Sequence, residues 1–252
     1  LNSYAGGTVI NGGVVKVGNG TTAGSLGTGP IVNNGSLIFD WSGSTPVAAP
    51  GNISGTGTIT KTGTGAVGLG GASTYTGGTS ILAGTLGAAG STPLGTNAGG
   101  TTVSPGARLL TLGTTSIPGN VTVSGNYDGG IDGAIQASGG TATTGATATI
   151  AGITLAGNTT LAADQYSSMT VSSIAGTGSN LNLVGAGSFT FNGANTYDGT
   201  TTVNSGVILF PNNPSALGTV ANGTPVSSGG VIYAPFAQTI AEPITISWLG
   251  VG

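Results

Sequence analysis

The fold is decided by residues 185–210, which read GAGSFTFNGANTYDGTTTVNSGVILF. After a glycine-rich start, Phe189 and Phe191 alternate with polar residues. Alternation with a period of two places both rings on one face, which is the pattern of a half-buried strand. The stretch then continues through Asn-Thr-Tyr, Gly-Thr, a β-branched run and a small-residue turn. It therefore predicts short strands joined by tight turns.

The second half of this stretch occurs three times. The segment NTYDGTTTVNSGVI (195–208) is matched by NSYAGGTVINGGVV (2–15) and STYTGGTSILAGTL (73–86), and the three tyrosines are Tyr4, Tyr75 and Tyr197. A second box follows each one: GSLGTGP (24–30), TPLGTNA (92–98) and SALGTVA (215–221). The repeat boxes thus lie near 1–30, 55–98 and 185–221. Such repetition favours a solenoid over a sandwich, because stacked repeats bury the faces that one repeat leaves open.

The rest of the chain follows the same strand pattern, for example Val121 with Val123 and Ile153 with Leu155. Every stretch with helical apolar spacing is broken by Gly or Pro within two turns. We predict an all-β fold, a parallel β-helix of roughly ten to twelve coils. It should form a single continuous segment over 1–252, with degenerate Ala-, Gly- and Thr-rich coils near 110–175. Glycine and asparagine at the corners supply the positive φ angles of sharp turns.

Charged residues are 4% of the chain, whereas an ordinary domain has about 25%. The cations are Lys16, Lys61 and Arg108, too few to neutralise an array of phosphates, so nucleic acid is excluded as a partner. The chain has no cysteine and no histidine. That removes disulfides, thiolate and imidazole metal sites, and the usual catalytic triads and dyads. We expect no cofactor.

The nearest approach to a chemical site is NYDGGIDGA (126–134), where Asp128 and Asp132 could offer oxygen ligands to Ca²⁺. The repeated nonapeptide of calcium-binding β-rolls is missing, so a solvated turn is the favoured interpretation. Asp164 could join these two acids across neighbouring coils, as a polysaccharide-degrading enzyme would require. Because the acids are spread along the chain, an enzyme is the least favoured class.

The three tyrosines at equal repeat positions could form a ladder for sugar stacking. Equal positions in a repeat are better explained by rings that stack on each other within the rod. Trp41 and Trp248 fit core or corner packing as well as they fit sugar stacking. These aromatic residues are therefore interpreted first as structural.

With the boxes in view, the chain resembles the passenger regions of bacterial autotransporters, in particular the autotransporter-associated β-strand repeat. The segment 185–210 is a close instance, GTGTITKTGTGAVGLGGASTYTGGTSILAGTL (55–86) is a looser one, and 1–15 matches the second half only. The resemblance covers about half of the residues. It implies a right-handed parallel β-solenoid exported to the outside or the cell surface of a Gram-negative-type bacterium. The chain shows no signal peptide, membrane span or C-terminal barrel, so the resemblance is that of a segment, and targeting segments are expected outside it.

The two ends of the chain read as the halves of one repeat. Placing WLGVG (248–252) before LNSYAGGT (1–8) aligns Trp248 with Phe189, Gly252 with Gly193, and Asn2 and Tyr4 with Asn195 and Tyr197. We expect an end-to-end junction formed by Leu1, Asn2, Tyr4, Trp248 and Gly252, either within a tandem array or between stacked copies. A fragment ending between strands by coincidence is the alternative.

These observations predict a non-enzymatic extracellular fibre that extends by end-to-end coil stacking, with further copies or adjacent repeats as its partners. An adhesin that binds surface glycans or matrix is the alternative. A carbohydrate-degrading β-helix would need three acids in one groove. The segment itself is not expected to be embedded in a membrane.

Overall fold

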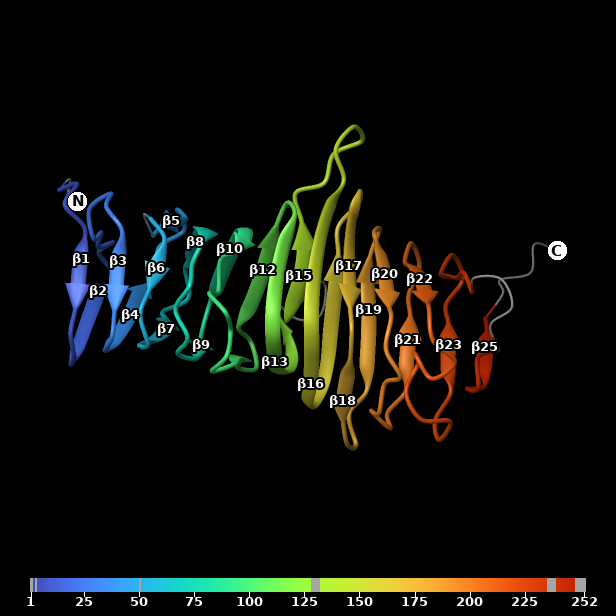
Figure 1. The fold of residues 1–252 in the computed structure, drawn as a ribbon. Helices are drawn as coiled ribbons and strands as arrows, with labels where there is room; N and C mark the ends of the chain where they lie inside the picture. The colour runs from blue at the N-terminus through green and yellow to red at the C-terminus, as the bar shows by residue number, and fades with distance from the viewer. Residues whose placement is uncertain (1, 3, 50, 128–131, 235–238, 248–252) are drawn as a thin grey trace.

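The computed structural model describes the chain except residues 1, 3, 50, 128–131, 235–238 and 248–252. The described part contains strands and turns but no α-helix. Figure 1 shows the strands stacked in chain order along a rod, with β1 near one end and β25 near the other. Parallel strands form a β-solenoid of about ten turns, which confirms the predicted fold class.

The strands fall into columns in which each strand pairs with its equivalent in the next coil. Column A is the three-stranded sheet of β1 (Thr8–Ile10), β3 (Ile31–Asn33) and β6 (Ile53–Ser54). Column B joins β2 (Val14–Gly20), β4 (Ser36–Trp41), β7 (Thr58–Thr62), β9 (Thr79–Ile81), β11 (Thr101–Val103), the end of β13 (Thr115–Tyr127), the middle of β16 (Ala146–Ala163) and β18 (Ile174–Gly176).

Two further columns complete the walls. Column C joins β5 (Val47–Ala48), β8 (Ala66–Ala72), β10 (Thr85–Thr92), β12 (Arg108–Leu112), β15 (Ile135–Ser138), the end of β16, β19 (Leu181–Gly185), β21 (Thr201–Val203), β23 (Thr224–Val226) and β25 (Ile244–Ile246). Column D joins the starts of β13 and β16 to β17 (Ser167–Val171), β20 (Ser188–Phe191), β22 (Ile208–Pro211) and β24 (Val231–Ile232).

The core consists of the alternate residues that point inward from each column. Phe39, Ile81 and Val103 belong to one such row of column B, and all are buried. Each fully buried aliphatic or aromatic side chain of this kind contributes roughly 1.5–3 kcal/mol relative to exposure. The same parity rule places Lys61 in this row, between Phe39 and Ile81.

The middle of the chain keeps the ladder but lengthens one turn. Val121 pairs with Ile153, 32 residues on, whereas Ile153 pairs with Ile174, 21 residues on. Part of the extra length forms β14 (Asp132–Gly133), which pairs antiparallel with the end of β13; every other strand pairing of the described residues is parallel. The rest forms a largely exposed loop over 139–145, which stands out from the rod in Figure 1.

Across the described residues, no helix is long and apolar enough to cross a membrane.

Candidate functional site

The three tyrosine boxes share one hydrogen bond. The hydroxyl of Tyr75 lies 2.7 Å from the Thr79 hydroxyl, Tyr4 and Thr8 are joined at 2.7 Å, and Tyr197 bonds to Thr201 in the same way. Tyr75 and Tyr197 are fully buried, and burial raises the pKa of both phenols above its ordinary value, while Tyr4 is 42% exposed. Each box thus carries its own hydroxyl partner four residues away, so the ring can enter the core without an unsatisfied polar atom.

The Leu-Gly-Thr boxes lie in the coil directly after each tyrosine. The amides of Thr28, Thr96 and Thr219 donate to the carbonyl oxygens of Tyr4, Tyr75 and Tyr197. The glycine before each threonine has a positive φ, and at Gly95 an added Cβ would lie 2.3 Å from the Tyr75 carbonyl oxygen. Only glycine combines this conformation with so close an approach. The two boxes are therefore halves of one unit that clamps adjacent coils together.

The first residue of the third box connects three coils. Asn195 Oδ1 accepts a hydrogen bond from the Ile174 amide at 2.7 Å, and Asn195 Nδ2 donates a hydrogen bond to the Ala216 carbonyl. Asn2 makes the second of these bonds, donating to the Ser25 carbonyl at 2.9 Å. These side chains satisfy backbone groups at corners where strand pairing stops.

The tyrosines do not lie above one another, because the boxes shift around the rod. The amide of Thr74, next to Tyr75, donates to Ile53 in column A, the column of the first box's strand β1. The amide of Thr196, next to Tyr197, donates to Ile174 in column B, the column of the second box's strand β9. Each of these tyrosines therefore occupies the column of the preceding box's strand, and the geometry provides no continuous tyrosine ladder.

Two of the three candidate acids, Asp132 and Asp164, lie in one polar network in the middle of the rod. Arg108 Nη1 lies 2.9 Å from Asp132 Oδ2 and 2.7 Å from Gln136 Oε1, and Gln136 donates to Asp164 at 2.8 Å. The guanidinium also lies 4.3 Å from the Tyr127 ring centroid. The described carboxylates of this network already have cationic or amide partners. The network is therefore better explained as a structural contact between coils than as a metal site. Asp128 lies outside the described residues, and the others include no cluster of three metal-ligating side chains.

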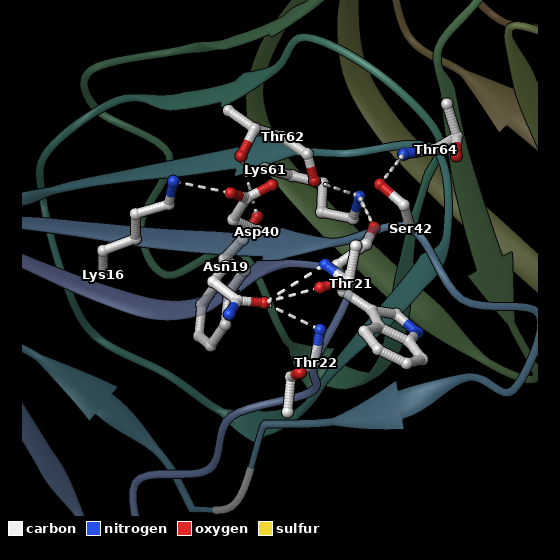
Figure 2. Close-up of polar contacts among 11 residues, drawn as sticks. Lys16, Asn19, Thr21, Thr22, Asp40, Ser42, Lys61, Thr62 and Thr64 are labelled. Atoms are coloured by element: carbon white, nitrogen blue, oxygen red, sulfur yellow. Dashed lines mark hydrogen bonds and ion pairs between the residues drawn. The ribbon is translucent and has the colours of Figure 1, made fainter.

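A second charged group lies near the N-terminal end. Figure 2 shows Lys16 reaching Asp40, with Nζ 2.6 Å from Oδ2, and the bond to Lys16 holds the pKa of the Asp40 carboxyl below its usual value. Lys61 is fully buried beside them. Its Nζ donates to the carbonyls of Thr62 at 2.6 Å and Gly63 at 2.7 Å. Burial lowers the pKa of Lys61 to about 8.

Glu242, near the other end, is the described residue with an unpartnered buried side-chain oxygen. It is 6% exposed, and Oε1 accepts the Thr224 hydroxyl at 2.9 Å, while Oε2 has no partner among the described residues. Burial raises the pKa of its carboxyl to about 7. A carboxyl in this position is more stable protonated, because the neutral form can donate and loses less hydration.

Of the expected junction residues, Leu1, Trp248 and Gly252 lie outside the described part of the chain. Asn2 and Tyr4 lie in the first coil, where Val9 and Val14 are 65% and 66% exposed. In the last column C strand, Ile246 is 74% exposed. Both edges of the described ladder thus present apolar side chains.

Comparison with known proteins agrees with this geometry. The family described as Passenger-associated-transport-repeat matches residues 1–17, 59–88 and 181–209, which contain the three tyrosine boxes. Three segments of the chain thus carry the autotransporter passenger repeat. The chain is also 51% identical over 53 residues to the "Adhesin BmaC autotransporter" of Brucella suis biovar 1 (strain 1330). That alignment covers 21% of the segment and 2% of the adhesin. No solved structure matches the segment.

Two of the groups described above, around Lys61 and around Arg108, were not expected from the sequence. Lys61 alternates with Ile59 in TITKT, and that parity alone predicts an inward side chain. The contact of Arg108 with Asp132 joins two coils, and neither residue lies in a repeat box, so no local pattern marks it.

Proposed function

We propose that this passenger segment is a non-enzymatic structural rod on the cell surface or outside of a Gram-negative bacterium. The observation that carries the proposal is the clamp made by each Tyr and Leu-Gly-Thr box, which uses the most distinctive side chains of the repeat to hold coils together. The two ion pairs among the described residues support it, since Lys16 is paired with Asp40 and Arg108 with Asp132. Neither pair leaves a free acid and base facing one substrate position.

The rod extends by further coil stacking, within a tandem array or between copies. The exposed apolar residues at both edges support this step, since a parallel edge is a template for pairing. Negative-stain electron microscopy and sedimentation of the purified segment test it. Fibres whose length grows with concentration are expected for stacked copies. Short rods of one length, from a segment that also has no equal repeat beside it in its parent chain, would contradict the proposal.

Adhesion to glycans or matrix is the second candidate function. It is favoured by the loop over 139–145, which interrupts an otherwise smooth rod, and by the name of the relative, which is called an adhesin. Binding of the labelled segment to immobilised neutral and acidic glycans and to matrix proteins tests it. A segment that retains none of them would exclude adhesion through this part of the parent.

A further inference from the structure

A shallow groove of about 320 Å³ follows the starts of three consecutive column D strands beside the protruding loop. Thr147, Ser168 and Ser188 line it, one from each of β16, β17 and β20. Ser168 pairs with Thr147 and with Ser188 in the ladder, so their side chains follow one another along the rod axis. Ile208, on the next strand, closes the row.

A second row of hydroxyls runs beside the groove. Thr149, Thr170 and Thr190 are paired in register on the same strands, two residues further along each. Their side chains point outward, because the residues between the two rows, Met169 and Phe189, are fully buried. Neighbouring hydroxyls in a row repeat at roughly 4.8 Å, the spacing of paired strands. None of the three threonine hydroxyls bonds to a described protein group, so all are available to a ligand.

An exposed aromatic ring lies at the wall of the groove. Tyr166 is 51% exposed and has a φ of 64°, a conformation that is rare for a bulky residue. Its carbonyl accepts the Ala146 amide at 3.1 Å, which fixes the corner against the preceding coil. The loop adds its own contact, since the Gly140 amide donates to Ser167 Oγ at 3.2 Å. These backbone contacts fix the corner that carries Tyr166, and its exposed side chain lines the groove beside the hydroxyl rows.

Among the residues that the structure describes, no charged side chain lines the groove. Asp164, two residues before Tyr166, accepts a hydrogen bond from Gln136. A ligand that suits this surface is neutral, extended, rich in hydroxyls and apolar on one ring face. We propose that the groove binds an unbranched neutral polysaccharide chain along the rod axis, with a sugar ring against Tyr166 and sugar hydroxyls bonded to the two Ser and Thr rows. The inference rests on the adhesive function proposed above.

The test is titration calorimetry of the whole segment with cellohexaose and chitohexaose, and with an acidic heparin hexasaccharide for comparison. Tyr166→Asn removes the ring and keeps a residue that tolerates this backbone conformation. The double variant Thr170→Val, Thr190→Val removes two hydroxyls at nearly constant volume. Its matched control is Thr102→Val, Thr122→Val, two paired residues of column B on another wall. Circular dichroism checks that all variants are folded.

We expect a neutral hexasaccharide to bind, each groove variant to weaken binding at least tenfold, and the column B control to leave it unchanged. Equal binding by the groove variants would overturn the groove while leaving glycan adhesion in place. No neutral binding by the unaltered segment, or preference for the heparin fragment, would overturn the inference and leave the rod, whose test is microscopy. Loss of self-association in the groove variants, with no sugar bound by any protein, would show that the surface joins copies instead.

Discussion

At the residue scale, the repeat places tyrosine and threonine hydroxyls in the core as pairs that hydrogen-bond to each other. Tyr197 and Thr201 lie in the interior with their hydroxyls bonded to each other. Removing one partner leaves the other without its bond in a place that water does not reach, which costs about 1–3 kcal/mol.

The first prediction concerns this pair. Tyr197→Phe should lower the free energy of unfolding by about 1–2 kcal/mol, because the Thr201 hydroxyl is left buried and unpaired. Tyr4→Phe makes the same chemical change where the ring is 42% exposed, and water can replace the partner. Urea denaturation of both variants measures the difference. Equal losses of unfolding free energy in the two variants would show that burial adds nothing to the contribution of the Tyr–Thr hydrogen bond.

The second prediction compares two lysines. Lys61→Met should destabilise the segment by about 2–3 kcal/mol, because the corner carbonyls of Thr62 and Gly63 lose a buried donor. Lys16→Met breaks an ion pair whose lysine is 52% exposed, and pairs of that kind contribute about 0–1 kcal/mol. Thermal melts of the two Lys→Met variants give the ranking. If Lys16→Met is the more damaging, the role assigned to Lys61 is wrong.

At the scale of the element, the last coil contains a titratable weak point. Glu242 precedes β25 and bonds to Thr224 of β23, and Tyr197 is the other titratable group whose pKa it influences. Its pKa is raised from an ordinary 4.5 to about 7 in the folded chain. The folded state therefore binds the proton more tightly than the unfolded state, and the stability this gives is present at low pH and lost as pH rises.

The third prediction follows from that sign. Between about pH 4.5 and pH 7, stability of the last coil should fall by up to ~3 kcal/mol, since each pKa unit corresponds to ~1.4 kcal/mol. Glu242→Gln should remove most of this dependence and keep the bond to Thr224. Hydrogen exchange of the β23 and β25 amides, corrected for intrinsic rates, measures it. A wild-type profile parallel to that of Glu242→Gln would contradict the assignment.

Strands and turns were largely predictable at this scale, while their placement around the rod was not. Period-two alternation predicted strands at Phe189, Val121 and Leu155, and the glycine corners predicted where they stop. The shift of successive boxes by one column depends on the lengths of the coils between them, which differ, with 20 residues from a β7 residue to its β9 partner and 32 from Val121 to Ile153. Turns of glycine, serine and threonine tolerate such differences at little energetic cost, so composition does not reveal them.

At the scale of the whole molecule, stability depends on backbone pairing and apolar burial, with little contribution from charge. Two ion pairs are found among the described residues, and a chain with 4% charged residues has few others to form. Screening by salt acts on interactions between charges, so it has little to act on here.

The fourth prediction is a stability that salt screening hardly changes. The melting temperature should differ by only a few degrees between low and moderate concentrations of sodium chloride, because the exposed Lys16 pair contributes about 0–1 kcal/mol. Differential scanning calorimetry measures it. The variant Arg108→Met, which removes the more buried pair, serves as a control that should shift the melting temperature at every salt concentration. A steep loss of stability on adding salt would show that charge pairing contributes more than the structure indicates.

The solenoid fold was predictable from the repeats, because stacking of coils buries the apolar face that each repeat box leaves open. The network of Arg108, Asp132 and Asp164 was only half anticipated. Convergence of the acids across coils was considered only as a less favoured alternative to a solvated turn, and the arginine that engages Asp132 comes from a coil whose sequence carries no signal. Contacts between residues more than twenty positions apart depend on coil length, which the boxes fix only near themselves.

The column shift has a consequence for how such a protein changes over generations. Because Tyr75 and Tyr197 each lie in the column of the previous box's strand, the repeat and the coil are out of phase. Gain or loss of one repeat by unequal recombination would therefore turn everything beyond it partway around the rod axis. A loop or groove could come to face a different direction from the cell without a single substitution in its own residues.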